Sequence, residues 1–167
     1  MFATKTSAAG LSVLSNTLLI LLKLVAGILS GSVSIIAEAI HSANDLIAAI
    51  IAFVSIRMAN RPADKEHPYG HGKIENISGT IEAILIFVAA GFIVYEAIDK
   101  IINKAEVEQL WLGIGIMAAS AIVNLSVSKH LLRVARRDDS IALEADGRHL
   151  TVDVFTSAGV ALGLLVV

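Results

Sequence analysis

Residues 32–58 of this 167-residue chain read SVSIIAEAIHSANDLIAAIIAFVSIRM. The stretch is apolar almost throughout, and it is longer than the roughly 20 residues that a helix needs to cross a lipid bilayer. It nevertheless carries Glu38, His41 and Asp45. Ionisable side chains are costly inside a membrane and usually serve a function there. The stretch therefore predicts a transmembrane helix that also carries chemistry.

Four other stretches have the length and apolarity of membrane spans, at about residues 11–29, 77–98, 110–132 and 141–167. The chain as a whole is 56% hydrophobic and 17% charged, whereas a typical soluble domain is about 25% charged. We therefore predict an all-α membrane protein, a single transmembrane helix bundle over residues 1–167 with five spans. The chain stops within the fifth apolar stretch, which we interpret as a fragment of a longer protein.

Charge and composition exclude some binding partners and indicate how the chain is oriented in the membrane. The net charge is −2, which gives no basic field for nucleic acid. The absence of cysteine excludes disulfides and thiolate metal sites. Lys and Arg gather in two of the connections between spans, around residues 57–73 and 129–148, and are sparse in the other two, at 30–32 and 99–108. The positive-inside rule then predicts a cytoplasmic N-terminus.

The spacing of His and Asp is the same in two of the spans. His41 precedes Asp45 by four residues, and His149 precedes Asp153 by four. Side chains at this spacing lie on one face of a helix, about 5–6 Å apart at their Cβ atoms. Two such helices facing each other would offer two imidazoles and two carboxylates, a set that suits tetrahedral zinc. The alternative is that each pair is only a hydrogen bond that stabilises its own helix.

A site of this kind also predicts exchange with protons. Imidazole and carboxylate ligands must be deprotonated to hold a metal, so metal binding releases protons. Glu38 and Asp146 each precede the histidine of their span by three residues. For Glu38 we expect a helix-packing contact, with a proton relay as the alternative. Asp146 is expected to lie near the start of its helix, where a carboxylate favours the helix dipole.

A third cluster lies in the connection between the second and third spans. Asp64, His67 and His71 fall within eight residues of one another, and Pro68, Gly70 and Gly72 favour a tight turn there. We predict that Asp64, His67 and His71 form a second metal site in this loop. The alternative is a polar loop with two surface histidines.

The three segments together resemble the cation diffusion facilitator family. They are AEAIHSAND at residues 37–45, HPYGHGK at 67–73 and ADGRHLTVD at 145–153, and the resemblance spans essentially the whole chain. It implies six transmembrane helices followed by a cytoplasmic metal-binding domain, of which this chain would lack the sixth helix and the domain. It also implies a homodimer in the lipid membrane that exports divalent metal ions against protons, and so a secondary transporter and not an enzyme.

The resemblance assigns roles to particular residues. The transport site falls on His41, Asp45, His149 and Asp153, and the loop site on Asp64, His67 and His71. Histidine at position 41 resembles the zinc-selective pattern, so we expect zinc as the transported ion. Lys73 matches a position that pairs with the missing domain. The compact loops suggest a bacterial inner (plasma) membrane.

Three other functions stay open at this point. The protein could export another divalent metal, namely cadmium, cobalt, nickel, iron or manganese. It could be an intramembrane metalloenzyme, although no HExxH motif is present. It could be a passive channel, although a closed four-ligand site binds too tightly for fast permeation.

Overall fold

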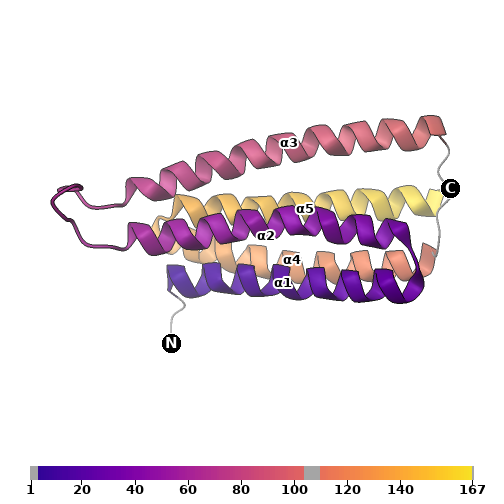
Figure 1. Ribbon diagram of the computed structural model, residues 1–167, viewed down its shortest axis with the longest axis horizontal. Coiled ribbons are helices and arrows are strands. Elements are labelled where there is room, and N and C mark those ends of the chain that lie inside the picture. The colour runs from indigo at the N-terminus through magenta and orange to yellow at the C-terminus, as the bar shows by residue number, and fades with distance from the viewer. Residues whose placement is uncertain (1–3, 104–109, 167) are drawn as a thin grey trace.

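The computed structural model describes residues 4–103 and 110–166, and of residues 33–34, 92–93, 96–97, 99–103, 110 and 156–166 it describes the backbone alone. In these ranges the chain forms five helices: α1 (Lys5–Ser30), α2 (Val33–Ala59), α3 (Lys73–Asn103), α4 (Leu110–Asp138) and α5 (Ile141–Val166). They lie lengthwise in one bundle, with α3 diverging from the others toward its Asn103 end (Figure 1). The predicted all-α helix bundle is confirmed.

Among the described residues, four helices hold stretches long and apolar enough to cross a membrane: Lys5–Ser30, Ile35–Ala59, Lys73–Gly91 and Trp111–Asp138. Their surface is apolar, and large side chains such as Leu18, Leu29 and Phe87 are exposed. Their interior is built instead from small residues, among them Ala8, Ala48 and Ala52. Small buried residues and large exposed apolar ones are typical of helices that pack together in lipid.

The helices extend beyond several of the predicted spans because helical structure continues into polar residues at the bundle ends. α1 begins at Lys5 behind the cap residue Thr4, whose side chain accepts a hydrogen bond from the Ser7 amide. It ends at Gly31, whose φ of 68° suits glycine. α4 continues to Asp138, past the predicted end near residue 132. Hydropathy marks the part of a helix that lies in lipid, and the helix itself can be longer. Residues 104–109, which include Lys104 of the predicted outer loop, lie outside the described residues.

Two glycines allow α5 to approach its neighbours closely. A Cβ atom added at Gly147 would lie 2.9 Å from Leu132 Cγ of α4, and one added at Gly79 of α3 would lie 2.8 Å from Ile141 Cγ2 of α5. A buried cluster of α1, α2, α4 and α5, including Ala8, Ile56 and Leu131, fills the bundle near the α2–α3 loop. This packing holds α5 between α4 on one side and α2 and α3 on the other.

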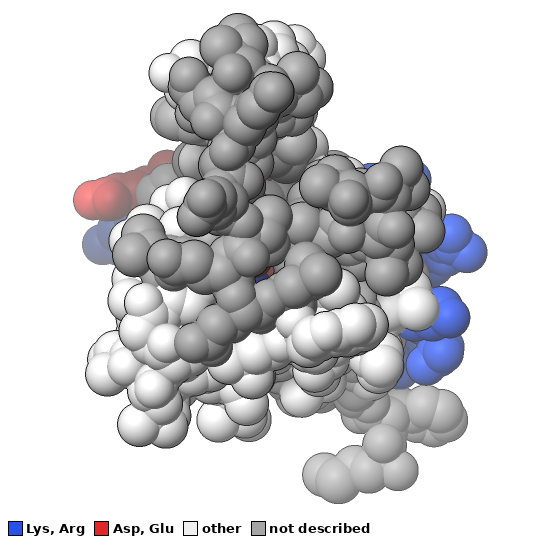
Figure 2. All heavy atoms as spheres, turned by 90° about the vertical axis from the view of Figure 1, so that its right-hand side faces the viewer, with Lys and Arg blue, Asp and Glu red and all other residues white. Residues whose placement is uncertain are grey.

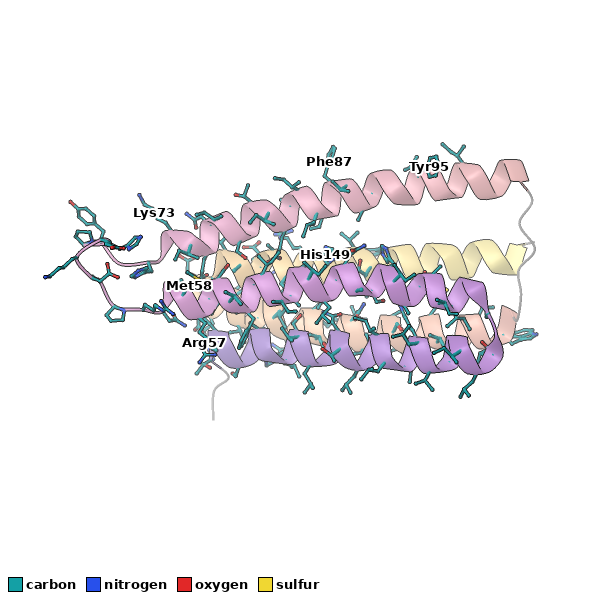
Figure 3. The ribbon with its side chains drawn as sticks, in the orientation of Figure 1. Arg57, Met58, Lys73, Phe87, Tyr95 and His149 are labelled. Carbon is teal, nitrogen blue, oxygen red and sulfur yellow. The ribbon has the colours of Figure 1, made fainter. Side chains whose placement is uncertain are left out.

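Charge is distributed unevenly along the bundle. Figure 2 views it from the end that carries the α1–α2 turn, where the described atoms in front are mostly uncharged and charged atoms show toward the two edges. The opposite end, around the α2–α3 loop, carries the exposed side chains Arg57, Arg61, Lys65 and Lys73. Arg57 and Lys73 mark that end in Figure 3. This is the end that the positive-inside rule predicts to be cytoplasmic.

Candidate metal centre

The residues that the sequence singled out in the second and fifth spans meet in the middle of the bundle. His149 of α5 is 5% exposed and Asp45 of α2 is 6% exposed. The Nε2 atom of His149 lies 3.3 Å from Asp45 Oδ1 and 3.9 Å from Asp153 Oδ2. His149 therefore links the carboxylates of two different helices. Figure 3 shows His149 midway along α5, beside α2.

The remaining histidine belongs to the same cluster. His41, Asp45 and Asp153 each offer a ligand atom, and these atoms all lie within 4.8 Å of one another. The structure thus brings together all four residues, two from α2 and two from α5, because each helix presents its i and i+4 side chains on the face turned to the other. Such a set of two imidazoles and two carboxylates has the donor atoms of a tetrahedral zinc site.

A cavity of about 220 Å³ reaches this cluster. Its polar wall contains His41, His149 and Asp153, and its other lining residues are apolar, including Ile86 and Val94 of α3. Apolar walls leave His41, His149 and Asp153 as the favourable place for a cation within this cavity, since a charge is costly to hold against hydrocarbon.

The loop residues also meet, in a turn between α2 and α3. Asp64 Oδ1 accepts hydrogen bonds from the backbone amides of Glu66 at 3.0 Å and His67 at 2.7 Å. Asp64 Oδ2 lies 3.3 Å from His71 Nε2. The ring centroids of His67 and His71 are 4.4 Å apart. Gly70 closes the turn with a φ of 83° and donates its N–H to the His67 carbonyl.

The loop cluster differs from the intramembrane one in its exposure. One ligand atom each of Asp64, His67 and His71 lie within 4.8 Å of one another, but about half of the Asp64 and His67 side chains is exposed. The backbone hydrogen bond from His67 holds the pKa of Asp64 below its usual range. The carboxylate is therefore ionised and available to a cation at neutral pH.

Comparison with known proteins identifies the family. Residues 10–167 match the family model described as the cation efflux transmembrane domain. The chain belongs to the cation efflux family. Its helix bundle, with four apolar spans among the described residues, is that of an integral membrane protein of this family, and the resemblance to cation diffusion facilitators is confirmed.

Three relatives show what share of a related protein's length this chain covers. The chain is 40% identical over 146 residues to an uncharacterized transporter of Synechocystis, covering 87% of this chain and 47% of the relative. It is 33% identical over 158 residues to the cation-efflux pump FieF of Shewanella oneidensis, covering 95% and 53%. It is 31% identical over 146 residues to the magnetosome protein MamB of Paramagnetospirillum magneticum, covering 87% and 49%. The chain spans about half the length of the curated relatives it matches.

Sequence reasoning missed a partly buried ion pair next to the cluster of this cation efflux protein. Lys23 of α1 is 5% exposed, and its Nζ donates to Glu38 Oε2 at 3.1 Å and to Ser42 Oγ at 2.7 Å. Lys23 also interacts electrostatically with Asp153. The sequence did offer a signal for this pair. Lys23 and Glu38 are opposite charges in neighbouring apolar spans, and charged side chains inside membranes usually pair with one another.

Asp146 lies near the start of α5, as expected, but it is buried inside the bundle. α5 begins at Ile141, and the acidic residue of its first turn is Glu144. Asp146 lies further along the helix and is 0% exposed, so it cannot be explained as a solvated carboxylate at a helix start. Glu38, in turn, does make a contact between helices, through its ion pair with Lys23.

Proposed function

We propose that this protein is a zinc/proton antiporter and that its cargo binds between α2 and α5 at His41, Asp45, His149 and Asp153. The observation that carries the proposal is the meeting of His149 with Asp45 and Asp153 at 3.3 and 3.9 Å inside a membrane helix bundle. Ionisable groups gathered at mid-membrane usually mark an ion pathway. Family membership supports metal export, and one relative is named a cation-efflux pump.

The donor atoms favour zinc over harder metals. Two imidazole nitrogens and two carboxylate oxygens match the ligands and the coordination number that zinc prefers. Manganese prefers oxygen ligands, whereas imidazole raises the affinity for zinc, cobalt and nickel. Zinc is therefore the proposed cargo, and export of cadmium, cobalt, nickel, iron or manganese is the alternative that a selectivity measurement decides.

Proton coupling follows from the same ligands. A metal ion can bind only when the histidines are neutral and the carboxylates are ionised, so protons and metal compete for one set of atoms. A proton gradient directed into the cytoplasm would then drive metal outward. The exposed cations around the α2–α3 loop support a cytoplasmic loop and N-terminus, in a bacterial inner membrane.

The family resemblance extends the proposal beyond this chain. It includes a sixth helix and a cytoplasmic domain in the full-length protein, a homodimer, and a second metal site at Asp64, His67 and His71. The mutual approach of these three side chains within 4.8 Å supports the loop site. The exposure of Asp64 and His67 suits a site that exchanges metal with the cytoplasm quickly.

Zinc uptake into proteoliposomes that enclose a fluorescent zinc indicator tests the proposal. The full-length protein should carry zinc inward when a proton gradient is directed outward, and Asp153→Ala should abolish this flux. Glu144→Gln is the matched control, because Glu144 lies on the same helix with about half of its side chain exposed. Undiminished flux in Asp153→Ala would refute the site.

A further inference from the structure

A second pair of buried carboxyl groups lies between α3 and α5. Glu82 of α3 and Asp146 of α5 are both 0% exposed, and they are close enough to interact electrostatically. Ser78 donates a hydrogen bond to Glu82 Oε1 at 3.3 Å. In the described part of the chain, Glu82 Oε2 and both carboxylate oxygens of Asp146 have no hydrogen-bond partner.

The packing of α3 on α5 produces this pair. Gly79 lies against α5, where a Cβ atom would be 2.8 Å from Ile141 Cγ2 and 3.9 Å from Ala145 Cβ. Glu82 follows Gly79 by three residues and so shares its face of α3. Asp146 follows Ala145 directly. The close approach at Gly79 therefore leaves both carboxyl groups inside the contact between the two helices.

No basic side chain neutralises the pair within the described residues. The titratable groups that act on Asp146 are Glu82 of α3, Asp45 of α2 and His149 of α5, and none comes from α4. From α1 comes the Ser12 hydroxyl, which is 0% exposed and lies beside Asp146 as a potential hydrogen-bond donor. The nearby lysines of α1 have other partners, since Lys23 pairs with Glu38 and Lys5 with Glu75.

Two carboxylates in this environment cannot both stay ionised without a bound cation, because neighbouring like charges repel and burial removes their hydration. A metal ion is a poor candidate, since neither residue lines the cavity that reaches the proposed metal site. A proton needs no cavity. It would also convert one carboxylate into a donor for the unpartnered acceptor oxygens.

We propose that Glu82 and Asp146 share a proton and that this proton is among those exchanged for the transported metal. The inference rests on the proposed antiport and adds a proton site separate from the metal ligands. Asp146 precedes His149 by three residues on the same helix, so a divalent cation bound at His149 would repel the shared proton. The carboxyl O–H then breaks, the proton passes to water, and a carboxylate remains until the metal leaves. The effect is reciprocal, because a proton on the pair must weaken metal binding equally.

Infrared difference spectroscopy tests the shared proton directly. In full-length protein in lipid at neutral pH, zinc addition should remove a carboxylic-acid C=O band. The band should shift on ¹³C-carboxyl labelling of glutamate or aspartate in the unmutated protein, a test that does not depend on the folding of a variant. It should be absent from Glu82→Gln and Asp146→Asn and present in Glu144→Gln. Absence of any such band from the wild-type protein, or its persistence in both variants, would overturn the proposal.

Counting protons separates this inference from the antiport itself. Zinc titrations in buffers of different ionisation enthalpy should show fewer protons released per zinc ion in Glu82→Gln and Asp146→Asn than in the wild type. The number of zinc sites should stay the same. Loss of a zinc site in these variants would mean that Glu82 and Asp146 bind metal and not a proton, and it would contradict the proposal. Failure of the antiport would show elsewhere, as zinc flux into proteoliposomes that does not respond to the proton gradient.

Discussion

His149 Nε2 lies 3.3 Å from Asp45 Oδ1, although 104 residues separate the two in sequence. This contact joins α5 to α2 inside the bundle, where both side chains are buried. A buried imidazole held between Asp45 and Asp153 is poised to accept either a proton or a metal ion, and the predictions below follow from that arrangement.

Asp45→Asn should weaken zinc binding at the intramembrane site by at least about tenfold to a hundredfold, the range found when even supporting groups of metal sites are changed. The amide keeps the shape of the side chain but removes the charge that holds the cation. Isothermal titration measures the effect. Asp139→Asn is the control, because Asp139 lies in the α4–α5 turn with a φ of 50°, which asparagine tolerates well. An equal loss of zinc affinity in Asp45→Asn and Asp139→Asn would count against Asp45 as a metal ligand.

His41→Asp should reduce the preference for zinc over manganese. It changes the donor set from two nitrogens and two oxygens to one nitrogen and three oxygens, and oxygen donors favour harder ions. Competition transport assays in proteoliposomes, with manganese present against zinc, would show the change. Replacement of His130, which belongs to neither proposed site, should leave the ratio unaltered. An unchanged ratio in His41→Asp would mean that another residue sets selectivity.

The loop site should lose metal on acidification without protonation of Asp64. The pKa of Asp64 is lowered by the backbone hydrogen bond from His67, so its charge persists as the pH falls and is lost only when the pH passes the lowered value. Protons that compete with the metal for the imidazole nitrogens should release it instead. Zinc titrations of a His41→Ala/Asp153→Ala variant isolate this site. An acid-resistant affinity would contradict the ligand set.

Gly147→Ala should destabilise the bundle by roughly 1–3 kcal/mol, the usual cost of overpacking. The added methyl would meet Leu132 Cγ at 2.9 Å and Leu131 Cβ at 3.3 Å. Gly115→Ala is the matched control, because a Cβ there meets no described atom within 4 Å and alanine favours the helix. Thermal unfolding in detergent compares them. A stability of Gly147→Ala equal to that of the control would mean that α4 and α5 are less closely packed.

Lys23→Met should destabilise the protein more than the double change Lys23→Met/Glu38→Gln. The single change leaves Glu38 without its ion-pair partner, whereas the double change removes both charges. The coupling between the two positions should be of order 0.5–3 kcal/mol in a double-mutant cycle of unfolding free energies. Additive effects would indicate that the two charges are independently solvated.

Periodicity and hydropathy predicted the helices well because a membrane helix must satisfy all of its backbone hydrogen bonds internally. They located the apolar part of α4 but not its end at Asp138. The last turns of this helix are polar and lie outside lipid, so hydropathy does not mark them. Spacing alone placed His41 with Asp45 and His149 with Asp153, because residues four apart in a helix are neighbours. Whether the two pairs face each other depends on how the helices pack, and no local sequence pattern encodes that packing.

Burial of acidic residues was the least predictable feature. Asp146 was expected near a helix start, and α5 does begin at Ile141, but its complete burial arises from the packing of α5 against its neighbours. Glu82 had no visible partner in sequence, since its proximity to Asp146 arises from the close approach of α3 to α5 at Gly79. Lys23 and Glu38 were recognisable as charges in apolar spans, but only the side-by-side packing of α1 and α2 shows that they pair.

The central claim is that His41, Asp45, His149 and Asp153 bind the transported metal, and zinc titration of two otherwise matched proteins tests it most directly. Both carry Asp64→Ala, His67→Ala and His71→Ala, so that the loop site is removed, and one carries His41→Ala and Asp153→Ala in addition. We predict that the first protein binds one zinc ion per chain with release of protons, and that the second binds none. Equal zinc binding by the two proteins would contradict the account and leave the intramembrane His–Asp contacts with a purely structural role.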